Sequence, residues 1–266
     1  MDSRNQSIRV SVIIPCFNDG GFLEEAIASV ETCPDPIYEI IVVNDGSTDP
    51  STLNILHDLT SKGYKVINQQ NRGPSAARNT GIRQAQGEYI LPLDADNRIR
   101  PAYIYRGIEI LDRYPDVAVA YSDVDHFGEK TGAKQIPDFC LSSLVVDNYI
   151  DNCAVFRKSA WAQCGFYDEE MPYYGQEDWD LWLSIAKKGF RFYHIPEVLF
   201  EYRVRADSMI QQFNEAKIRV MSRYLASKHA ALFPKEYRYY LKPYRGWIKI
   251  REAWRSLLKR RTLNID

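Results

Sequence analysis

Two aspartates two residues apart, Asp94 and Asp96, follow directly on the apolar run YILPL at residues 89–93. In an extended segment, residues i and i+2 point to the same side, so both carboxylates could project together from the end of a buried strand. Two hard oxygen ligands at a strand end suit a divalent ion that also holds phosphate oxygens. The pair is equally compatible with a turn and with a cap for a helix that begins near Pro101.

The first half of the chain alternates short apolar runs with helical patterns, and these elements must position the two acids. Strands alternating with helices, and apolar on both faces, predict a mostly parallel sheet covered on both sides. In such sheets, ligands bind at the carboxyl ends of the strands, where Asp45, Asp94 and Asp96 all stand. The predicted strands cover residues 10–14, 39–43, 65–67 and the run that ends in the aspartate pair, and the predicted helices cover 22–30, 53–59 and 74–86.

The second half of the chain predicts a mixed architecture, because strands no longer alternate regularly with helices. A boundary near residue 205 is compatible with the pattern, although no linker composition marks it. The predicted strands cover residues 117–121, 154–157, 190–195 and 199–203, and the predicted helices cover 178–188, 208–232 and 244–261.

Size and composition place the chain among soluble globular proteins. Its 266 residues suffice for one large α/β domain, with or without an extension, and 45% of them are apolar. No apolar run is long enough to span a bilayer, and the polar first residues predict no signal peptide. Five cysteines without a CxxC pair predict reduced thiols in a cytosolic protein, and the four scattered histidines argue against zinc.

The net charge of −1 hides a basic C-terminal segment. Residues 242–266 hold eight basic and two acidic side chains, a net charge of +6, which leaves −7 on the rest of the chain. In the helix predicted over 244–261, Trp247 and Trp254 lie beside basic residues, which suits an anionic membrane surface. A helix docked on the body with a solvated basic face fits equally well. No nucleic-acid partner is expected, because the basic residues are confined to this one segment.

Four segments, taken in order, carry a resemblance to a known family. They are VIIPCFN at residues 12–18, VVNDGSTD at 42–49, NRGPSAARNTG at 71–81, and the Asp94/Asp96 pair followed by EDWD at 177–180. Each is weak alone, but their order and their places at strand ends are specific. Over about residues 8–205 the chain resembles the family 2 glycosyltransferases, which are inverting, nucleotide-sugar-dependent enzymes of GT-A fold.

The resemblance implies a donor site. Asp45 is similar to the family aspartate that accepts a hydrogen bond from uracil, and Arg78, near Gly73, looks like the family arginine beside the diphosphate. A surface salt bridge is the alternative for Arg78. The residues that would line the base and ribose are Pro15, Phe17 and Asn18, and ordinary loop packing is the alternative for the first two.

The resemblance also implies a metal cofactor, Mn²⁺ or Mg²⁺, bridging the diphosphate oxygens. Asp96 would be a ligand, Asp94 would contact the ribose or a metal-bound water, and Ala95 would lie against the donor between them. His194 either reaches the metal or is a hydrogen-bonded strand histidine. Many relatives carry a histidine where this chain has Arg205, which leaves the third ligand open and makes Arg205 and its neighbour Arg203 candidate phosphate contacts.

Inversion by single displacement needs one base to take the proton from the acceptor hydroxyl. The candidate is Asp178, which is similar to the second acid of the family's Glu-Asp pair, and the positive end of a helix would keep it ionised. Glu177 would help to position the acceptor or Asp178, although both acids also fit ordinary helix N-terminal charges. Trp179 either stacks on an acceptor sugar or, at helical spacing with Trp182, belongs to the core.

These expectations define one account of the chain. Its fold is α/β of GT-A type, with a Rossmann-like nucleotide-binding half over about 8–100 and a mixed acceptor-binding half over about 101–205. A helical extension, residues 206–266, follows this catalytic domain of residues 1–205. The expected reaction moves one sugar from a nucleotide donor, UDP-linked by preference, to a glycan or lipid-linked acceptor in surface polysaccharide or glycoconjugate synthesis. The expected place is the cytoplasm, with peripheral attachment to the inner face of the membrane.

Two other functions compete with this account. A non-catalytic relative that binds a nucleotide sugar or a glycan would keep the fold, but the presence of Asp94, Asp96 and Asp178 argues against it. A sugar nucleotidylyltransferase would need a Gly-rich lysine signature, which the chain lacks. Processive polysaccharide synthases are disfavoured because the chain has neither a Gln-x-x-Arg-Trp motif nor a transmembrane helix.

Overall fold

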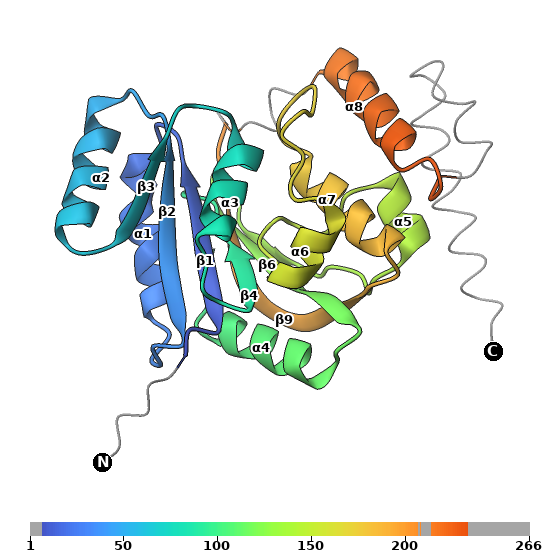
Figure 1. Cartoon of the computed structure of the whole chain (residues 1–266), viewed down its shortest axis with the longest axis horizontal. Helices are drawn as coiled ribbons and strands as arrows, with labels where there is room; N and C mark the ends of the chain where they lie inside the picture. The colour runs from blue at the N-terminus through green and yellow to red at the C-terminus, as the bar shows by residue number, and fades with distance from the viewer. Residues whose placement is uncertain (1–6, 207, 209–213, 234–266) are drawn as a thin grey trace.

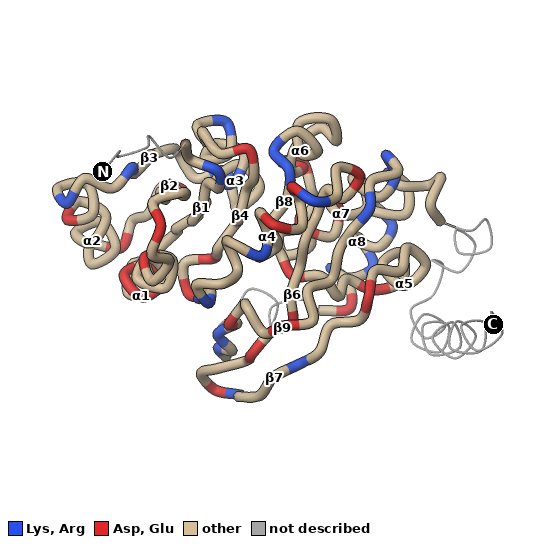
Figure 2. The backbone as a smooth tube through the Cα atoms, turned by 90° about the horizontal axis from the view of Figure 1, so that it is seen from below, with Lys and Arg blue, Asp and Glu red and all other residues tan. Residues whose placement is uncertain are grey.

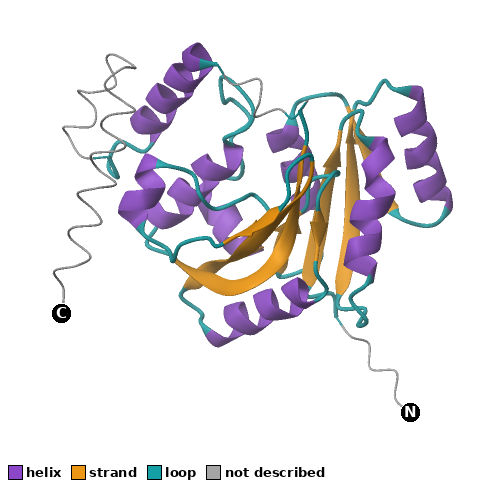
Figure 3. Ribbon diagram, turned by 180° about the vertical axis from the view of Figure 1, so that it is seen from behind, coloured by secondary structure: helices purple, strands orange, loops and turns teal. Residues whose placement is uncertain are grey.

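The structure, a computed structural model, describes residues 7–206, 208 and 214–233. These residues build a nine-stranded sheet in the order β3-β2-β1-β4-β8-β6-β9-β5, with β7 paired to β6, and helices cover both faces (Figure 3). The strands are β1 (Val10–Cys16), β2 (Tyr38–Asp45), β3 (Lys65–Gln69), β4 (Tyr89–Pro92), β5 (Arg98–Ile99), β6 (Val117–Gly128), β7 (Gly132–Lys134), β8 (Val155–Arg157) and β9 (Arg191–Val204).

The N-terminal half has the parallel strand arrangement that the sequence predicts. β3, β2, β1 and β4 pair in parallel, with α1 (Gly20–Glu31) and α2 (Pro50–Ser61) on one side and α3 (Pro74–Arg83) on the other (Figure 1). From β1 the chain adds β2 and then β3 on one side, and it then returns through α3 to place β4 on the other side of β1. The strand order therefore reverses between β1 and β4. Ligands of open α/β sheets bind at such a switch point, outside the carboxyl ends of the strands.

Small residues let α3 lie close to the sheet. A Cβ at Gly81 would lie 2.5 Å from Ile13 Cγ2 and 3.1 Å from Val43 Cγ2, which leaves no room for a side chain. Ala76 and Ala77 on the same helix are buried. This close packing brings the first turn of α3 to the carboxyl ends of β1 and β2.

The C-terminal half is mixed, as expected. β8 runs antiparallel between β4 and β6, and β6 pairs in parallel with β9. One sheet therefore continues through both halves. The helices of this half are α4 (Ala102–Arg113), α5 (Leu141–Val146), α6 (Lys158–Cys164), α7 (Glu177–Lys187) and α8 (Glu215–Lys228).

Several predicted boundaries are wrong. The strands predicted over 190–195 and 199–203 are one strand, β9, whose register against β6 shifts at Ser122/Asp123, across from the proline-containing stretch. β5, β7, α5 and α6 were not predicted, because two to seven residues are too few to show a period. α8 begins only at Glu215, where the Asn214 side chain accepts a hydrogen bond from the Lys217 backbone N–H at 3.0 Å.

The helix α8 is attached to α7 through a buried carboxylate. Asp180 is 1% exposed and accepts hydrogen bonds from Lys228 Nζ at 2.9 Å and from His229 Nε2 at 2.7 Å. Lys228 also bonds Asp168, as does the Tyr224 hydroxyl. The described part of the predicted C-terminal extension is thus connected to the rest of the molecule by charged hydrogen bonds.

Basic and acidic residues are both distributed over the described part of the chain (Figure 2). The basic segment 242–266, with the helix predicted over 244–261, lies outside the described residues, and its membrane role stays a prediction. Within the described part of the chain, no helix combines the length and apolarity that a bilayer crossing needs. All five cysteines are free thiols, as expected.

Candidate active site

The loops after β1 and β2 are tied together by Asn18. Its side-chain oxygen accepts hydrogen bonds from the backbone N–H groups of Thr48 and Asp49, at 2.8 and 2.9 Å. Asn18 itself adopts φ +57°, a left-handed conformation that asparagine tolerates. Its neighbour Phe17 is 48% exposed, and Pro15 is partly buried at the end of β1. The fixed turn therefore presents an aromatic ring to solvent beside the switch point.

Asp45, at the end of β2, organises the loop that leads into α3. Its Oδ1 accepts hydrogen bonds from Gln69 Nε2 at 2.7 Å and the Arg72 backbone N–H at 3.0 Å, and its Oδ2 accepts from Gly73 N at 2.8 Å. A carboxylate offers about four lone-pair directions. Three donors therefore leave room for one more hydrogen bond from a ligand.

The segment Asp94–Asn97 is a turn and not the extended strand end that the sequence predicts. β4 stops at Pro92, and the Asn97 N–H donates to the Asp94 carbonyl oxygen at 3.0 Å. Asp94 and Asp96 thus occupy one turn, with Ala95 buried between them. The helix-cap alternative is wrong, because the residue before α4 is Pro101 and no side chain caps that helix.

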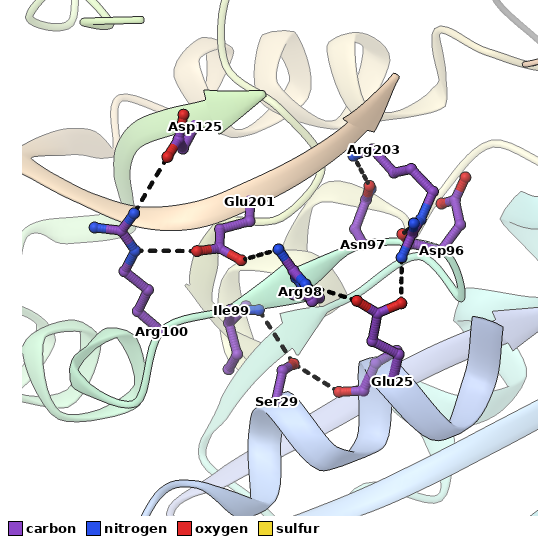
Figure 4. A network of polar contacts seen from close by, with 11 residues as sticks. Glu25, Ser29, Asp96, Asn97, Arg98, Ile99, Arg100, Asp125, Glu201 and Arg203 are labelled. Atoms are coloured by element: carbon purple, nitrogen blue, oxygen red, sulfur yellow. Dashed lines mark hydrogen bonds and ion pairs between the residues drawn. The ribbon is translucent and has the colours of Figure 1, made fainter. Parts of the chain in front are cut away.

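A network of arginines and acids holds this turn in place (Figure 4). Arg203 of β9 donates from its backbone N–H to Asn97 Oδ1 at 2.8 Å and from Nε to the Asp96 carbonyl oxygen at 2.9 Å. Its guanidinium also pairs with Glu25 of α1 and lies between the rings of Phe22 and Phe127. The orientation of Asp96 is therefore fixed by contacts from the first helix and the last strand.

Arg78 connects the two halves of the site. It is 4% exposed, so the surface salt-bridge alternative is wrong. Its Nη1 donates to Glu177 Oε1 and its Nη2 to Asp94 Oδ1, both at 2.7 Å. Although burial acts in the other direction, the charges of these two carboxylates raise the pKa of Arg78. A permanent cation on α3 therefore holds the Asp94 turn beside the N-terminus of α7.

Glu177 and Asp178 stand in contrasting environments. Despite burial, the Arg78 charge and hydrogen bonds to Arg78 and the Gly175 N–H lower the pKa of Glu177. Burial, together with the charges of Glu177 and Asp151, raises the pKa of Asp178 to about 8. The expectation that the helix end keeps Asp178 ionised is therefore wrong, since desolvation and like charge outweigh the dipole. A pKa near the working pH suits a general base.

Asp178 faces a pocket of about 220 Å³. Its Oδ2 accepts a hydrogen bond from Asn148 Nδ2 at 2.9 Å. Asp151 and Tyr202, which the sequence analysis did not single out, also line this pocket. Burial raises the pKa of Asp151 to about 7, aided by the charges of Asp94 and Asp96. Asp151 was overlooked because it precedes its strand, β8, whereas strand-end reasoning searches only the carboxyl side.

Trp179 is not placed to stack on an acceptor sugar, and His194 is not placed to bind a metal beside the Asp94/Asp96 pair. Trp179 is 5% exposed and donates its indole N–H to the Leu144 carbonyl oxygen at 2.6 Å, so it is a core residue and presents no stacking face. His194 has one ring nitrogen 2.9 Å from Asp123 Oδ1 and the other 3.1 Å from Asp138 Oδ1. Both nitrogens are engaged with acids other than the Asp94/Asp96 pair.

The acids at the turn fit a cation shared with a substrate. Burial and the charges of Asp94 and Asp19 raise the pKa of Asp96 to about 6, although Arg205 Nη1 lies 3.3 Å from its Oδ2. Among the described residues, no group of three or more His, Cys, Asp and Glu side chains is placed to hold a metal. Magnesium-type ions are commonly held by one or two carboxylates and the phosphates of a substrate. The carboxylates of Asp94 and Asp96 match that donor set.

Solved structures share this fold. S. aureus TarS in complex with UDP-GlcNAc superposes with a TM-score of 0.69 at 20% identity, covering 84% of this chain and 69% of that chain. The mannosyltransferase PcManGT from Pyrobaculum calidifontis, in complex with GDP-Man and Mn²⁺, gives a TM-score of 0.60 at 19% identity, covering 86% of this chain and 74% of that chain. At these identities the likeness establishes the GT-A fold alone.

Sequence relatives indicate the family as well as the fold. The putative glycosyltransferase EpsE of Bacillus subtilis is 30% identical over 213 residues, which cover 77% of this chain and 75% of that protein. The putative teichuronic acid biosynthesis glycosyltransferase TuaG of the same organism is 29% identical over 209 residues, covering 75% of this chain and 81% of that protein. Other relatives are much longer: the chain spans 25% of protein y4gI of Sinorhizobium fredii, at 28% identity over 82% of this chain.

The sequence pattern of one family matches most of the catalytic region. Residues 11–164, which run from β1 to the end of α6, match the family described as glycosyl transferase family 2. The match includes the turns after β1, β2 and β4 that build the site. This chain belongs to glycosyl transferase family 2.

Proposed function

We propose that this glycosyltransferase moves a single sugar, with inversion, from a UDP-linked donor to a glycan or lipid-linked acceptor in surface polysaccharide or glycoconjugate synthesis. The observation that carries the proposal is the Arg78 bridge. One buried guanidinium bonds Asp94, in the turn at the switch point, and Glu177, next to Asp178. The donor-side and acceptor-side acids therefore belong to one site, as a direct displacement requires.

The relatives support the choice of donor and pathway. TarS was solved with UDP-GlcNAc and with UDP, and TuaG is described as a teichuronic acid biosynthesis enzyme. PcManGT, by contrast, was solved with GDP-Man, so the fold also accommodates guanosine donors. The remaining hydrogen-bond capacity of Asp45 suits the N–H of a uracil ring, and the exposed ring of Phe17 suits stacking on the base.

The donor diphosphate would lie against the turn at Asp94 and Asp96, where Arg203 and the first turn of α3 are near. The residues that would hold a divalent cation there are Asp96 and Asp94, and His194 is not included because both of its ring nitrogens are engaged. A bound Mn²⁺ or Mg²⁺ would supply positive charge to the leaving diphosphate. Arg78 contributes by fixing Asp94 in the orientation that the donor needs.

Asp178 would act as the base. The acceptor hydroxyl oxygen forms a bond to the anomeric carbon while the bond from that carbon to the diphosphate oxygen breaks, and the hydroxyl proton passes to the Asp178 carboxylate. Asn148 and the Trp179 backbone N–H hold that carboxylate in place. Glu177 stays ionised and paired with Arg78, so its role is to position Asp178 rather than to move a proton.

A donor screen tests this function. Full-length protein would be mixed with UDP-, GDP- and dTDP-sugars in the presence of Mn²⁺ or Mg²⁺, and release of nucleoside diphosphate and the shift in Tm would be followed. We expect one UDP-sugar to stabilise the protein and to be slowly hydrolysed, and EDTA to remove both effects. No response to any donor would contradict the proposal and favour a non-catalytic relative.

A further inference from the structure

The pocket in front of Asp178 has one wall formed by a β-ribbon. β6 and β7 pair in antiparallel fashion, with Val124 opposite Lys134 and His126 opposite Gly132. Alternate residues of a strand share a face, and the pocket is lined by Ser122, Val124 and His126 from β6 and by Lys134 and Ile136 from the opposing segment. The side chain of Lys134 therefore belongs to the pocket and not to the outer face of the ribbon.

The ionisable groups of this pocket lie on two sides. Asp151 and Asp178 lie on the side formed by the α5–β8 connection and the N-terminus of α7, whereas His126 and Lys134 lie on the ribbon. Asp125, between the two pocket residues of β6, pairs instead with Arg100. His126 is bonded through Nδ1 to the Gly132 carbonyl oxygen at 3.2 Å and its ring meets Tyr202 edge-on.

Lys134 has no ion-pair or hydrogen-bond partner within the part of the chain that the structure describes, and it is exposed. Aromatic side chains line the same pocket, namely Tyr121, Tyr149, Phe200 and Tyr202. Aromatic rings offer flat apolar faces to the C–H faces of a sugar ring. Lys134 on the ribbon and Asp178 at the start of α7 line one pocket from different elements, so a ligand there can meet a cation and a proton acceptor together.

We propose that the acceptor is an acidic sugar, whose carboxylate or phosphate group pairs with Lys134 while its reacting hydroxyl faces Asp178. This inference rests on the proposed function, because it needs Asp178 as the base. It assigns Lys134 as a residue that selects the acceptor. A lysine ammonium is a flexible point charge with three donors, so it serves a carboxylate and a phosphate alike.

The test compares three forms of the same acceptor ring. The probes are the methyl glycosides of glucose, galactose and mannose, each as the neutral sugar, the uronic acid and the 6-phosphate. Each probe is titrated by calorimetry onto full-length protein saturated with UDP and Mn²⁺. The variants are Lys134→Met, which removes the charge, Lys134→Arg, which keeps it, and Lys130→Met, a control in the turn of the same ribbon that does not line the pocket.

We expect at least one acidic probe to bind wild type about tenfold more tightly than its neutral form, as charge-assisted hydrogen bonds imply. Lys134→Met should abolish this preference and its dependence on salt, whereas Lys134→Arg and Lys130→Met should keep it. Whichever of the uronic acid and the 6-phosphate binds more tightly identifies the anionic group.

Equal binding of neutral and acidic probes, binding of none of them, or a preference that survives Lys134→Met would overturn the inference. These results leave the proposed function intact as long as UDP binds in a metal-dependent manner. Failure of UDP itself to bind would instead contradict the proposed function, and the two failures are therefore distinguishable.

Discussion

At the scale of single residues, the site is defined by how burial and charge act on a few acids. Glu177 and Asp178 are neighbours in sequence, yet Arg78 holds one of them ionised while burial and like charge raise the pKa of the other to about 8. Pairs of acids driven apart in this way are typical of sites that divide positioning and proton transfer between two residues. This division leads to two predictions.

The first prediction concerns pH. A base must lose its own proton before it accepts another, so kcat/KM for the acceptor should rise with pH and level off above about 8, near the pKa of Asp178. Initial rates between about pH 6 and 9.5 measure this dependence. A flat profile, or one that falls over this range, would contradict the role of Asp178 as the base.

The second prediction concerns Arg78. Arg78→Lys keeps a positive charge, but one ammonium cannot reproduce the forked contact with Asp94 and Glu177. We expect kcat to fall about 10²-fold, the loss typical when a positioned catalytic group is released, and the free energy of unfolding to fall by about 3 kcal/mol. Arg83→Lys is the matched control, since Arg83 lies on the same helix but is exposed. Equal activity of both variants would contradict the bridging role.

At the scale of elements, the connection between α7 and α8 is a specific, testable contact. Asp180→Asn leaves Lys228 and His229 without their buried carboxylate, which we expect to cost about 3 kcal/mol. Thermal unfolding and limited proteolysis around residues 206–233 would measure the release of α8. The control is Glu215→Gln, which breaks an exposed pair with Arg219 on the same helix and should cost less than about 0.5 kcal/mol. Similar Tm values for the two variants would show that α8 is held by other contacts.

A further prediction concerns the turn before α3. Gly73 has φ +86°, and a Cβ there would lie 2.3 Å from Tyr174 Cζ. Gly73→Ala should therefore displace Tyr174 and disturb the Gly73 N–H bond to Asp45, raising KM for the donor several-fold and costing about 1–3 kcal/mol in stability. Adding Tyr174→Ala removes the clash but not the backbone strain, so it should restore only part of the loss. Complete recovery, or no effect of Gly73→Ala, would contradict this reasoning.

The elements also show how far the sequence predicts this molecule. β1 to β4 were predicted from apolar runs that alternate with segments of helical period, and the turn residues that follow these runs indicated the site. The sequence left Trp179 open between a ligand contact and the core, because a tryptophan at a helix start looks the same in both cases, and the structure shows that it belongs to the core. The contact of Arg78 with Glu177 joins residues 99 positions apart, and Asp151 approaches Asp94 and Asp96 from a separate segment. No local pattern reports such contacts.

At the scale of the whole molecule, a single sheet joins the parallel half, in which we propose that the donor binds, to the mixed half, in which we propose that the acceptor binds. Binding of cation and nucleotide should therefore be coupled at the Asp94–Asp96 turn. We expect UDP to raise Tm only when Mn²⁺ or Mg²⁺ is present, and Asp96→Asn to remove this dependence without lowering the Tm of the free protein. Differential scanning fluorimetry with and without EDTA measures both. Stabilisation by UDP that is indifferent to EDTA would contradict a shared cation.

The central claim is that one site binds a nucleotide sugar and uses Asp178 to activate the acceptor. Its most direct test compares wild type with Asp178→Asn for donor binding and for sugar transfer at about pH 8. Asp178→Asn should leave the fold at least as stable. Because the pKa of Asp178 is raised in the folded protein, ionisation of this carboxyl lowers the free energy of unfolding as pH rises towards that pKa. We predict unchanged donor affinity and a loss of transfer of about 10²- to 10⁴-fold. Transfer that persists at the wild-type rate in Asp178→Asn would contradict the account.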